Sequence, residues 1–432
     1  MNSTSLHFDE QAETASQDEL RSIQNQRLRA VVGRVYEKNE TQRARFRAAG
    51  IEPGDIKGLD DLPGLPTMDK ALFRDNYPLG LSCVDKQMIA EMHMSSGSTG
   101  VPVVMPYTQG DLNEWADCMA RCLCMAGAQS TDVIQITPSF GLFNGGFGFY
   151  HGAEALGLFV LPTGAGNTRR QIRLATDLST RIMTGVVSYG VRIMEVLQEE
   201  QEVLPDLEIG IFGGETFSDA MKKKLSEGLG AEIFDIYGMT ETGGVGTLGM
   251  DCPAHDGLHV WEDKFLVELN DPETGAPVPD GQEGELVVTA LSLEALPVIR
   301  LKTGDLTRVV SRERCACGRT HIRIAPIIGR TDDMLMVKGV NFFPSQVEHI
   351  LMEMPGVGSN YQIIIEDIEG IKDIRINVEA ESGVTGFAIE KHLKEALGFS
   401  PKGDVFPLGS LPRQQEGKSQ HVFYKDTDGT LR

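Results

Sequence analysis

The sequence lacks the long apolar runs and the cysteine framework that define several large classes of protein. No uninterrupted apolar run reaches the roughly 18 residues that a membrane-spanning helix needs. The N-terminal stretch has neither the basic region nor the apolar region of a secretory signal. Cysteine is sparse and odd in number, with 7 residues in 432, which argues against a disulfide scaffold and for a reducing compartment. We therefore expect a cytoplasmic protein without a membrane partner.

The sequence also lacks positive charge. It contains 40 Lys and Arg against 62 Asp and Glu, which gives a formal net charge of −22. A chain this acidic, without a basic run, is a poor candidate for binding nucleic acid. Any polyanionic ligand must be held by backbone groups and a few placed cations.

Apolar residues make up 41% of the chain, which is enough for a full core. Glycine is abundant, with 48 residues against a typical share of about 7%, and it gathers in short loops between strand-like and helix-like segments. Strand-like runs at 132–136, 157–161, 209–212, 231–236 and 284–289 alternate with helical stretches such as 168–182 and 216–229. This alternation predicts an α/β fold of layered sheets and helices.

The pattern changes near residue 330. A short strand at 334–337 is followed by a helix near 344–354 and by strands near 361–366 and 373–379. We predict a large N-terminal domain over residues 1–329 and a small α+β C-terminal domain over residues 330–432, whose length lies inside the usual range.

Three loops carry groups suited to phosphate and ribose. The stretch 95–100 offers hydroxyls and backbone N–H groups to an anion, although an ordinary polar turn is the alternative. The stretch 235–243 ends an apolar strand with Glu241, and a carboxylate beside phosphates is a natural Mg²⁺ ligand. In the third loop Asp305 follows a turn glycine, where it could accept from ribose hydroxyls. Each of these last two, taken alone, is also typical of a hairpin turn.

Two further segments suggest a metal site. Cys315 and Cys317 place two thiols on one turn, Cys252 offers a third thiol, and either His255 or His259 offers a fourth ligand. Structural Cys₃His zinc sites are usually built from two such ligand-bearing loops. Exposed thiols on a hairpin are the alternative.

In this order the motifs resemble the phenylacetate-CoA ligase family of the adenylate-forming acyl-CoA synthetases. The resemblance rests on the stretches 73–78, 95–102, 257–263 and 339–345, and it covers residues 20 to 420 or so. It implies an ATP-dependent ligase with two half-reactions. A carboxylate attacks the α-phosphate of ATP to give an acyl-adenylate and pyrophosphate, and CoA thiolate then attacks the acyl carbon and releases AMP. It also implies that the large domain binds AMP and the acyl group, while the small domain is a mobile lid.

The resemblance implies roles for individual residues. Lys418, Glu241 and Arg330 would be catalytic, with Glu241 binding Mg²⁺, and Asp332 would be the hinge. The implied nucleotide- and CoA-binding positions are Ser95, Ser96, Gly97, Ser98, Thr99, Gly100, Gly213, Gly214, Glu215, Asp235, Tyr237, Gly238, Met239, Thr240, Asp305, Lys338 and Gly339. Some family members have a histidine before the Trp-Glu-Asp stretch, so the implied zinc ligands are Cys252, His259, Cys315 and Cys317.

The family's acyl pocket corresponds to the aromatic and glycine-rich stretch 140–151. The substrate positions are then Phe140, Phe143, Gly145, Phe149 and Tyr150, and such rings favour an aromatic acid. An aromatic core hairpin is the alternative. One departure from the family is Val101, where the phosphate loop usually has lysine, and this weakens phosphate holding.

We therefore predict a ligase that joins an aromatic or arylacetic carboxylic acid to CoA, using ATP and Mg²⁺, with a structural zinc. One alternative is an enzyme of the same fold that adenylates a cofactor without using CoA. Another is a non-catalytic protein that binds acyl groups or nucleotides. The expected partner is the small aromatic acid, and a homodimer is one option for the assembly.

Overall fold

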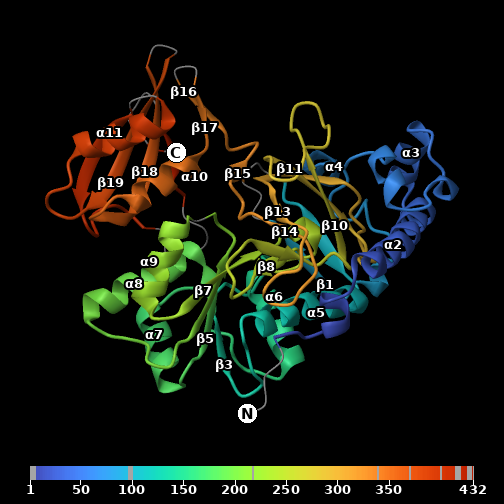
Figure 1. Ribbon diagram of the computed structural model, residues 1–432, viewed down its shortest axis with the longest axis horizontal. Coiled ribbons are helices and arrows are strands. Elements are labelled where there is room, and N and C mark those ends of the chain that lie inside the picture. Colours follow the sequence, from blue (N-terminus) through green and yellow to red (C-terminus); the bar gives the residue numbers. More distant parts are fainter. Residues whose placement is uncertain are drawn as a thin grey trace.

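The computed structural model describes residues 6–95, 101–216, 218–337, 340–368, 371–398, 401–413, 420–425 and 431. Figure 1 shows a large layered body, with the C-terminal elements in orange and red lying against its α8–α9 side. Within the described residues, no helix is both long enough and apolar enough to cross a membrane.

The helices begin and end as follows: α1 (Glu10–Glu13), α2 (Gln17–Lys38), α3 (Glu40–Ala48), α4 (Lys70–Asp75), α5 (Gln109–Met125), α6 (Gly145–Leu156), α7 (Thr168–Asp177), α8 (Val187–Glu200), α9 (Asp219–Leu229), α10 (Pro344–Glu353) and α11 (Gly386–Leu397), with 3₁₀ turns η1 (Pro53–Asp55), η2 (Leu59–Gly64), η3 (Lys86–Met88) and η4 (Thr240–Thr242). The strands are β1 (Glu91–Met94), β2 (Val104–Tyr107), β3 (Val133–Ile136), β4 (Phe159–Leu161), β5 (Ile182–Val186), β6 (Ile209–Gly213), β7 (Glu232–Tyr237), β8 (Gly249–Asp251), β9 (Leu258–Val260), β10 (Phe265–Asn270), β11 (Gly284–Ala290), β12 (Leu301–Thr307), β13 (Val309–Ser311), β14 (Arg323–Ile324), β15 (Gly329–Arg330), β16 (Leu335–Val337), β17 (Val340–Phe342), β18 (Val357–Ile368), β19 (Ile371–Ala380), β20 (Lys402–Pro407) and β21 (Val422–Lys425).

A nine-stranded sheet in the order β13-β14-β9-β8-β7-β6-β5-β3-β4 forms the centre of the molecule. The strands from β4 to β7 are parallel, and β8, β9, β14 and β13 continue the sheet in antiparallel fashion. Strand side chains alternate between the two faces. Ile211 thus joins the core that contains residues of α5 and α6, while Phe212 joins the core that contains residues of α7, α8 and α9. The predicted α/β fold is confirmed.

A second sheet, of strands β10-β11-β12-β15, lies beside the N-terminal helices. One face of α2 packs on it through Leu28, Val32 and Val35, which share a core with Leu266 and Ile299. The last strand of this sheet ends at Arg330, and from there the chain runs into the C-terminal elements.

The C-terminal elements form their own layer. A four-stranded sheet in the order β20-β19-β18-β21 is covered by α10 and α11, and the core between them includes Leu351, Ile363 and Leu393. The predicted β-α-β pattern after residue 330 is present. The exact division at residues 329 and 330 stays a prediction.

One predicted helix was too long. The stretch 168–182 was expected to be helical throughout, but α7 ends at Asp177. Ser179 has a φ of 51°, which is a left-handed conformation that a helix does not continue through. Ile182 already belongs to β5, and its apolar side chain is fully buried there.

A buried ion pair fastens the N-terminal segment to the turn between β13 and β14. Glu13 and Arg319 are both fully buried, and Arg319 Nε lies 2.8 Å from Glu13 Oε2. Glu13 Oε1 also accepts the backbone N–H groups of Phe8 and Asp9, each at 2.8 Å. The loss of one charge would leave the other uncompensated in the interior.

We expect Glu13→Ala to lower the free energy of unfolding by about 3–5 kcal/mol, because Arg319 would remain buried without its counter-charge. Urea unfolding at neutral pH measures this. Glu10→Ala is the matched control, since Glu10 is exposed on the same short helix, and it should change stability by less than about 0.5 kcal/mol. Equal losses in the two variants would show that the ion pair does not hold this segment.

Candidate active site and candidate metal centre

The carboxyl end of β7 carries the predicted stretch 235–243, which we call the strand-end motif. Tyr237 is the last residue of the strand, and Glu241 follows in η4 with a 3% exposed side chain. Gly238 has no room for a side chain, because a Cβ there would lie 2.3 Å from the carbonyl oxygen of Gly244. The loop therefore folds tightly back on itself and holds Glu241 at the end of the sheet. Met239 and Thr240 lie between the two.

Asp305 joins this motif to the strand that leads into the C-terminal elements. The Tyr237 hydroxyl donates to Asp305 Oδ2 at 2.5 Å, and Arg330 forms an ion pair with Asp305 Oδ1. Arg330 Nε also donates to Asp332 Oδ1 at 2.9 Å. Burial disfavours the Asp332 carboxylate, but the hydrogen bond and charge of Arg330 prevail and lower its pKa. The predicted ribose, catalytic and hinge residues are thus in direct contact.

The predicted adenine-binding residues end the neighbouring strand, β6. A Cβ at Gly213 would lie 2.2 Å from the carbonyl oxygen of Ile236 on β7, so only glycine fits there. Gly214 follows, and Glu215 Oε2 accepts the backbone N–H of Ser188 at 2.7 Å. The other predicted residue, Asp235, lies on β7, and its burial and the charge of Asp251 raise its pKa to about 7.

Several predicted residues lie outside the described part of the chain. They are Ser96, Gly97, Ser98, Thr99, Gly100, Lys338, Gly339 and Lys418. Ser95 is described, and it closes the base of its loop. Its Oγ accepts the backbone N–H of Val103 at 3.0 Å, and its own N–H donates to the Val103 carbonyl at 2.9 Å.

A cation that the sequence analysis missed lies beside Glu241. Lys70, the first residue of α4, has its Nζ 3.9 Å from Glu241 Oε1. Its charge also lowers the pKa of Asp332. No local motif marks this lysine, because the approach of residues 70 and 241 depends on the tertiary fold.

The predicted acyl-pocket residues fall into different environments. Phe149 is 1% exposed in the main core, whereas Phe143 is 52% exposed. Phe140 and Tyr150 are partly buried and meet edge to face, with ring centroids 6.4 Å apart. Gly145 is the first residue of α6.

The aromatic group continues into residues that the sequence analysis did not assign to the pocket. Phe147 meets Phe140 edge to face at 5.4 Å, and His151 lies 6.1 Å from Tyr150. The side-chain amide of Asn144 donates to Thr240 Oγ1 at 3.0 Å. That hydrogen bond brings the start of α6, with its rings, next to the loop that bears Glu241.

A carboxylate shared by two histidines borders the aromatic group. Glu91 Oε1 lies 2.6 Å from His93 Nε2 and 3.5 Å from His151 Nε2. His93 also packs edge-on against Trp115 and Tyr107. Burial opposes ionisation of Glu91, but the hydrogen bonds from His151 and His93 outweigh it and lower its pKa to about 2. The Glu91 side chain is therefore charged at neutral pH.

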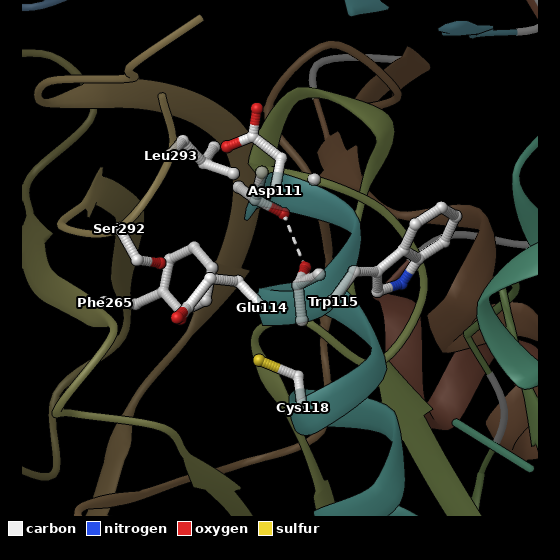
Figure 2. A pocket seen from close by; sticks show the side chains of 10 residues that line it. Asp111, Glu114, Trp115, Cys118, Phe265, Ser292 and Leu293 are labelled. Atoms are coloured by element: carbon white, nitrogen blue, oxygen red, sulfur yellow. Dashed lines mark hydrogen bonds between the residues drawn. The ribbon is translucent and has the colours of Figure 1, made fainter. Parts of the chain in front are cut away.

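A small cavity lies between α5 and the loop after Glu241. Figure 2 shows Asp111, Glu114, Trp115 and Cys118 on the helix, facing Phe265, Ser292 and Leu293. Its volume is about 10 Å³, which is room for about one water molecule. The cavity is too small for an organic substrate.

The four predicted metal ligands come together away from the strand-end motif. Their ligand atoms all lie within 4.8 Å of one another; the residues are Cys252, His259, Cys315 and Cys317. Cys252 follows β8, His259 lies on β9, and the cysteine pair occupies the turn between β13 and β14. The two Sγ atoms of Cys252 and Cys315 are 3.7 Å apart, and Cys317 Sγ is 3.4 Å from His259 Nε2.

The alternative histidine does not join this cluster. His255 Nδ1 lies 2.8 Å from Asp251 Oδ2, and its Nε2 lies 3.2 Å from Glu232 Oε1. The charge of Lys222 is paired with the same Asp251 carboxylate. His255 is therefore part of an ion-pair network at the surface.

Comparison with known proteins defines the class of this fold and site. The chain matches the AMP-binding enzyme family over residues 8–293 and the AMP-binding enzyme C-terminal domain over residues 339–425. It is 37% identical to a phenylacetate-coenzyme A ligase from Thermus thermophilus, covering 97% of this chain and 99% of that protein. It is 38% identical to a phenylacetate-coenzyme A ligase from Escherichia coli, covering 95% and 96%. The chain belongs to the phenylacetate-CoA ligase family, and it is an AMP-forming ligase that joins an acid to CoA through a thioester.

Solved structures of a 2-hydroxyisobutyryl-CoA ligase share the fold at 26% identity. The complex with 2-HIB-AMP in the postadenylation state superposes with a TM-score of 0.91, covering 99% of this chain and 94% of that one. The complex with 2-HIB-AMP and CoA in the thioesterification state gives a TM-score of 0.74, covering 98% and 93%. The arrangement of this chain is therefore closer to the first of these two states.

We expect Glu91→Gln to lower the free energy of unfolding at neutral pH by about 1–3 kcal/mol, because the histidines lose a charged acceptor. A lowered pKa stabilises the folded state above the ordinary glutamate value of 4.5, and this contribution is lost as the pH falls towards about 2. The difference in free energy of unfolding between variant and parent should therefore be largest above pH 4.5 and decrease below it.

Urea unfolding measured between pH about 7 and about 3.5 tests this dependence. This pH range includes the upper part of the interval between the pKa of Glu91 in the unfolded chain and its lower pKa in the folded protein. Glu154→Gln is the control, since Glu154 is exposed on α6 and should give no pH-dependent difference. A Glu91→Gln effect that stays constant across this range would contradict the charged state assigned to Glu91.

Proposed function

We propose that the acid is an aromatic or arylacetic carboxylic acid, which is adenylated by MgATP and then transferred to CoA. The observation that carries the proposal is the hydrogen bond between Asn144 and Thr240, at 3.0 Å. Through it the rings of Phe140, Phe147 and Tyr150 border the loop that holds Glu241. Apolar rings complement an aryl group, and the curated relatives are phenylacetate-CoA ligases.

The strand-end residues then take the following roles. Glu241 would hold Mg²⁺, and the ion would supply positive charge that stabilises the negative charge of the phosphates. Asp305 accepts from the ribose hydroxyls, and Arg330, already paired with Asp305, contacts ribose or phosphate. The backbone at Gly213, Gly214 and Glu215 and the end of β7 line the adenine. Residues 95–100 hold the outer phosphates.

Lys418 would act in the first half-reaction. A lysine ammonium placed at the α-phosphate stabilises the negative charge that develops there as the carboxylate attacks. Lys338 and Gly339 would serve the second half-reaction, with CoA.

Lys70 compensates for the departure at Val101. The family's phosphate loop usually carries a lysine where Val101 stands, and an acidic chain needs a placed cation to hold a polyphosphate. Lys70 Nζ is 3.9 Å from Glu241 Oε1, so its charge lies where Mg²⁺ and the phosphates would be. A cation on α4 would replace the one missing from the loop.

The small domain would rotate between the two half-reactions about a hinge at Asp332. The 2-hydroxyisobutyryl-CoA ligase superposes on this chain with a TM-score of 0.91 in its postadenylation state and 0.74 in its thioesterification state. Such motions use a few residues at the ends of elements. Asp332 lies between β15 and β16, at the junction of the two bodies, which supports its assignment.

The experiment is a pyrophosphate-release screen over carboxylic acids with and without CoA. We expect aromatic and arylacetic acids to give turnover above aliphatic acids of similar size, and the acyl-CoA thioester to accumulate only when CoA is present. Selective turnover of aliphatic acids would overturn the aromatic assignment. An adenylated product that never reaches CoA would favour the CoA-independent alternative, which the curated relatives do not favour.

We also propose that the Cys₃His cluster holds a structural zinc. A tetrahedral site with usual Zn–S and Zn–N distances needs ligand atoms roughly 3.4–3.8 Å apart. The Sγ atoms of Cys252 and Cys315 are 3.7 Å apart, and Cys317 Sγ is 3.4 Å from His259 Nε2. Cys252, Cys315, Cys317 and His259 would fill all four positions, so the metal would stabilise the turn and take no part in catalysis.

Purified protein should contain close to one zinc per chain. Cys315→Ser should lower both the zinc content and the melting temperature, because a hydroxyl is a poor zinc ligand and the turn would lose a crosslink. Metal analysis and thermal unfolding measure the two effects. His255→Gln is the control and should keep its zinc, since His255 lies outside the cluster. Zinc lost from His255→Gln but kept by Cys315→Ser would overturn the ligand set.

A further inference from the structure

One arginine connects the small domain to the large one. Arg413 lies between two glutamates: its Nη2 is 2.9 Å from Glu195 Oε1, and its Nε is 3.0 Å from Glu195 Oε2. The same side chain reaches Glu379, with Nη2–Oε2 at 2.8 Å and Nη1–Oε1 at 3.1 Å. Glu195 is on α8 of the large body, and Glu379 is on β19 of the small one. Figure 1 shows these two bodies meeting on the side of α8 and α9.

Within the small domain, Glu379 holds Arg413 in place. The Glu379 side chain is 1% exposed. It accepts the backbone N–H groups of Gly409 at 3.0 Å and Leu411 at 2.7 Å. These contacts involve only elements of the small domain, so they persist in any arrangement of the two domains. Arg413 is therefore pre-oriented before it meets Glu195.

Glu195 differs from Glu379, because Glu195 belongs to the large domain. Its hydrogen bonds to Arg413 exist only in the present arrangement of the two domains. Within α8 it has a second cation partner, Arg192, whose Nη1 is 3.3 Å from Glu195 Oε2. Separation of the domains would therefore leave Glu195 paired within its own helix. The ion pair between Glu195 and Arg413 can therefore break while each residue keeps an oppositely charged partner in its own domain.

The polar contacts between α9, with its N-cap Ser218, and the small domain are longer. Burial and the charge of Glu215 raise the pKa of Glu348 to about 7. The polar contacts of Glu348 and Lys224 across this interface are long, at 3.4 Å from the Ser218 N–H to Glu348 and 3.3 Å from Lys224 to the Val357 carbonyl. Compared with these two contacts, the Arg413–Glu195 pair is stronger, because two charge-assisted hydrogen bonds join the two side chains.

We propose that Glu195 is a positioning residue: through Arg413 it docks the small domain in the arrangement used for adenylation, and it must release Arg413 before transfer to CoA. The proposal rests on the proposed function, since it needs two half-reactions in two arrangements. Arg413 precedes Lys418 by 5 positions in the sequence.

The test is Glu195→Gln, with the two half-reactions measured separately in the full-length protein. Acyl-adenylate formation from acid and ATP should slow by about tenfold, as expected for the loss of a partly buried charge pair. Thioester formation from supplied acyl-adenylate and CoA should be unchanged or faster, because the second arrangement loses nothing. Glu195→Asp keeps the charge and should restore part of the adenylation rate.

Glu199→Gln is the matched control. Glu199 lies one turn further along α8, is 58% exposed and pairs with Arg192, without contact to Arg413. It should leave both half-reactions as in the parent enzyme. Both variants remove one charge from the same helix, so a general electrostatic effect would appear in both.

Salt provides a readout that a purely structural defect would not change. Because the pair is partly exposed, raising the salt concentration from about 0.05 M to about 0.5 M should screen it. The adenylation rate of the parent enzyme should then approach that of Glu195→Gln. A rate gap that does not narrow, or an equal loss in both half-reactions, would overturn the proposal.

The outcomes separate this proposal from the function beneath it. If the parent enzyme forms no thioester from any acid, the proposed function fails, and this inference fails with it. If the parent enzyme performs both half-reactions and Glu195→Gln behaves like Glu199→Gln, only the docking role of Glu195 is overturned.

Discussion

The Asp305 carboxylate is the point on which the arrangement of the site depends. Asp305 lies on β12. It accepts a hydrogen bond from the Tyr237 hydroxyl at the end of β7 in the central sheet, and it forms an ion pair with the Arg330 guanidinium on β15. Three segments that are distant in the sequence are thereby held at one carboxylate. Arg330 is also bonded to Asp332, so the same group connects the strand-end motif to the start of the C-terminal elements. A nucleotide bound as proposed would contact Arg330, which lies at the junction between the domains.

The surplus of negative charge explains why the cations of this protein are so specifically placed. With a net charge of −22, long-range attraction opposes the approach of a polyanion such as ATP. Local cations must compensate, and Lys70 and Arg330 both lie among carboxylates at the strand-end motif. Arg413 does the same between the domains, where it separates Glu195 from Glu379. Each of these cations therefore bridges segments that would otherwise repel each other.

Local sequence patterns predicted those parts of the site that local geometry determines. The end of β7 was recognisable because an apolar strand, an aromatic residue and a glycine precede Glu241 within a few positions. The thiol pair was recognisable because Cys315 and Cys317 share one turn, whereas the resemblance to the family was needed to choose His259 over His255. The pairing of β9 with β8 and β14 sets His259 opposite Met250 and Arg323, inside the sheet. His255 falls in the turn before β9, where acidic side chains bind it.

Other features were invisible in the sequence because they arise from contacts across long separations. Lys70 meets Glu241, Glu91 meets His151, and Glu195 meets Arg413 only after the chain has folded. Lys70, Glu91 and Glu195 belong to no motif of fixed spacing. The end of α7 was misjudged for a related reason, since the apolar residues after Asp177 suit a helix face and a buried strand equally well. Tertiary pairing with β3 and β6 decides between them.

The thiol cluster and the N-terminal ion pair act on the same short turn. Cys315, Cys317 and Arg319 lie within five consecutive residues, and the Cys315 N–H donates to the Arg319 carbonyl at 2.9 Å. Glu13 holds that arginine from the N-terminal segment, and a zinc bound as proposed would tie the cysteines to Cys252 and His259 of the central sheet. Because both fastenings constrain one turn, their contributions to stability should not simply add. Loss of the zinc would let the turn move, which would weaken the ion pair between Arg319 and Glu13. Loss of that ion pair would in turn disturb the positions of the cysteines that a metal needs. With zinc bound, the edge of the nine-stranded sheet at β13 and β14 would be held by two interactions that depend on each other.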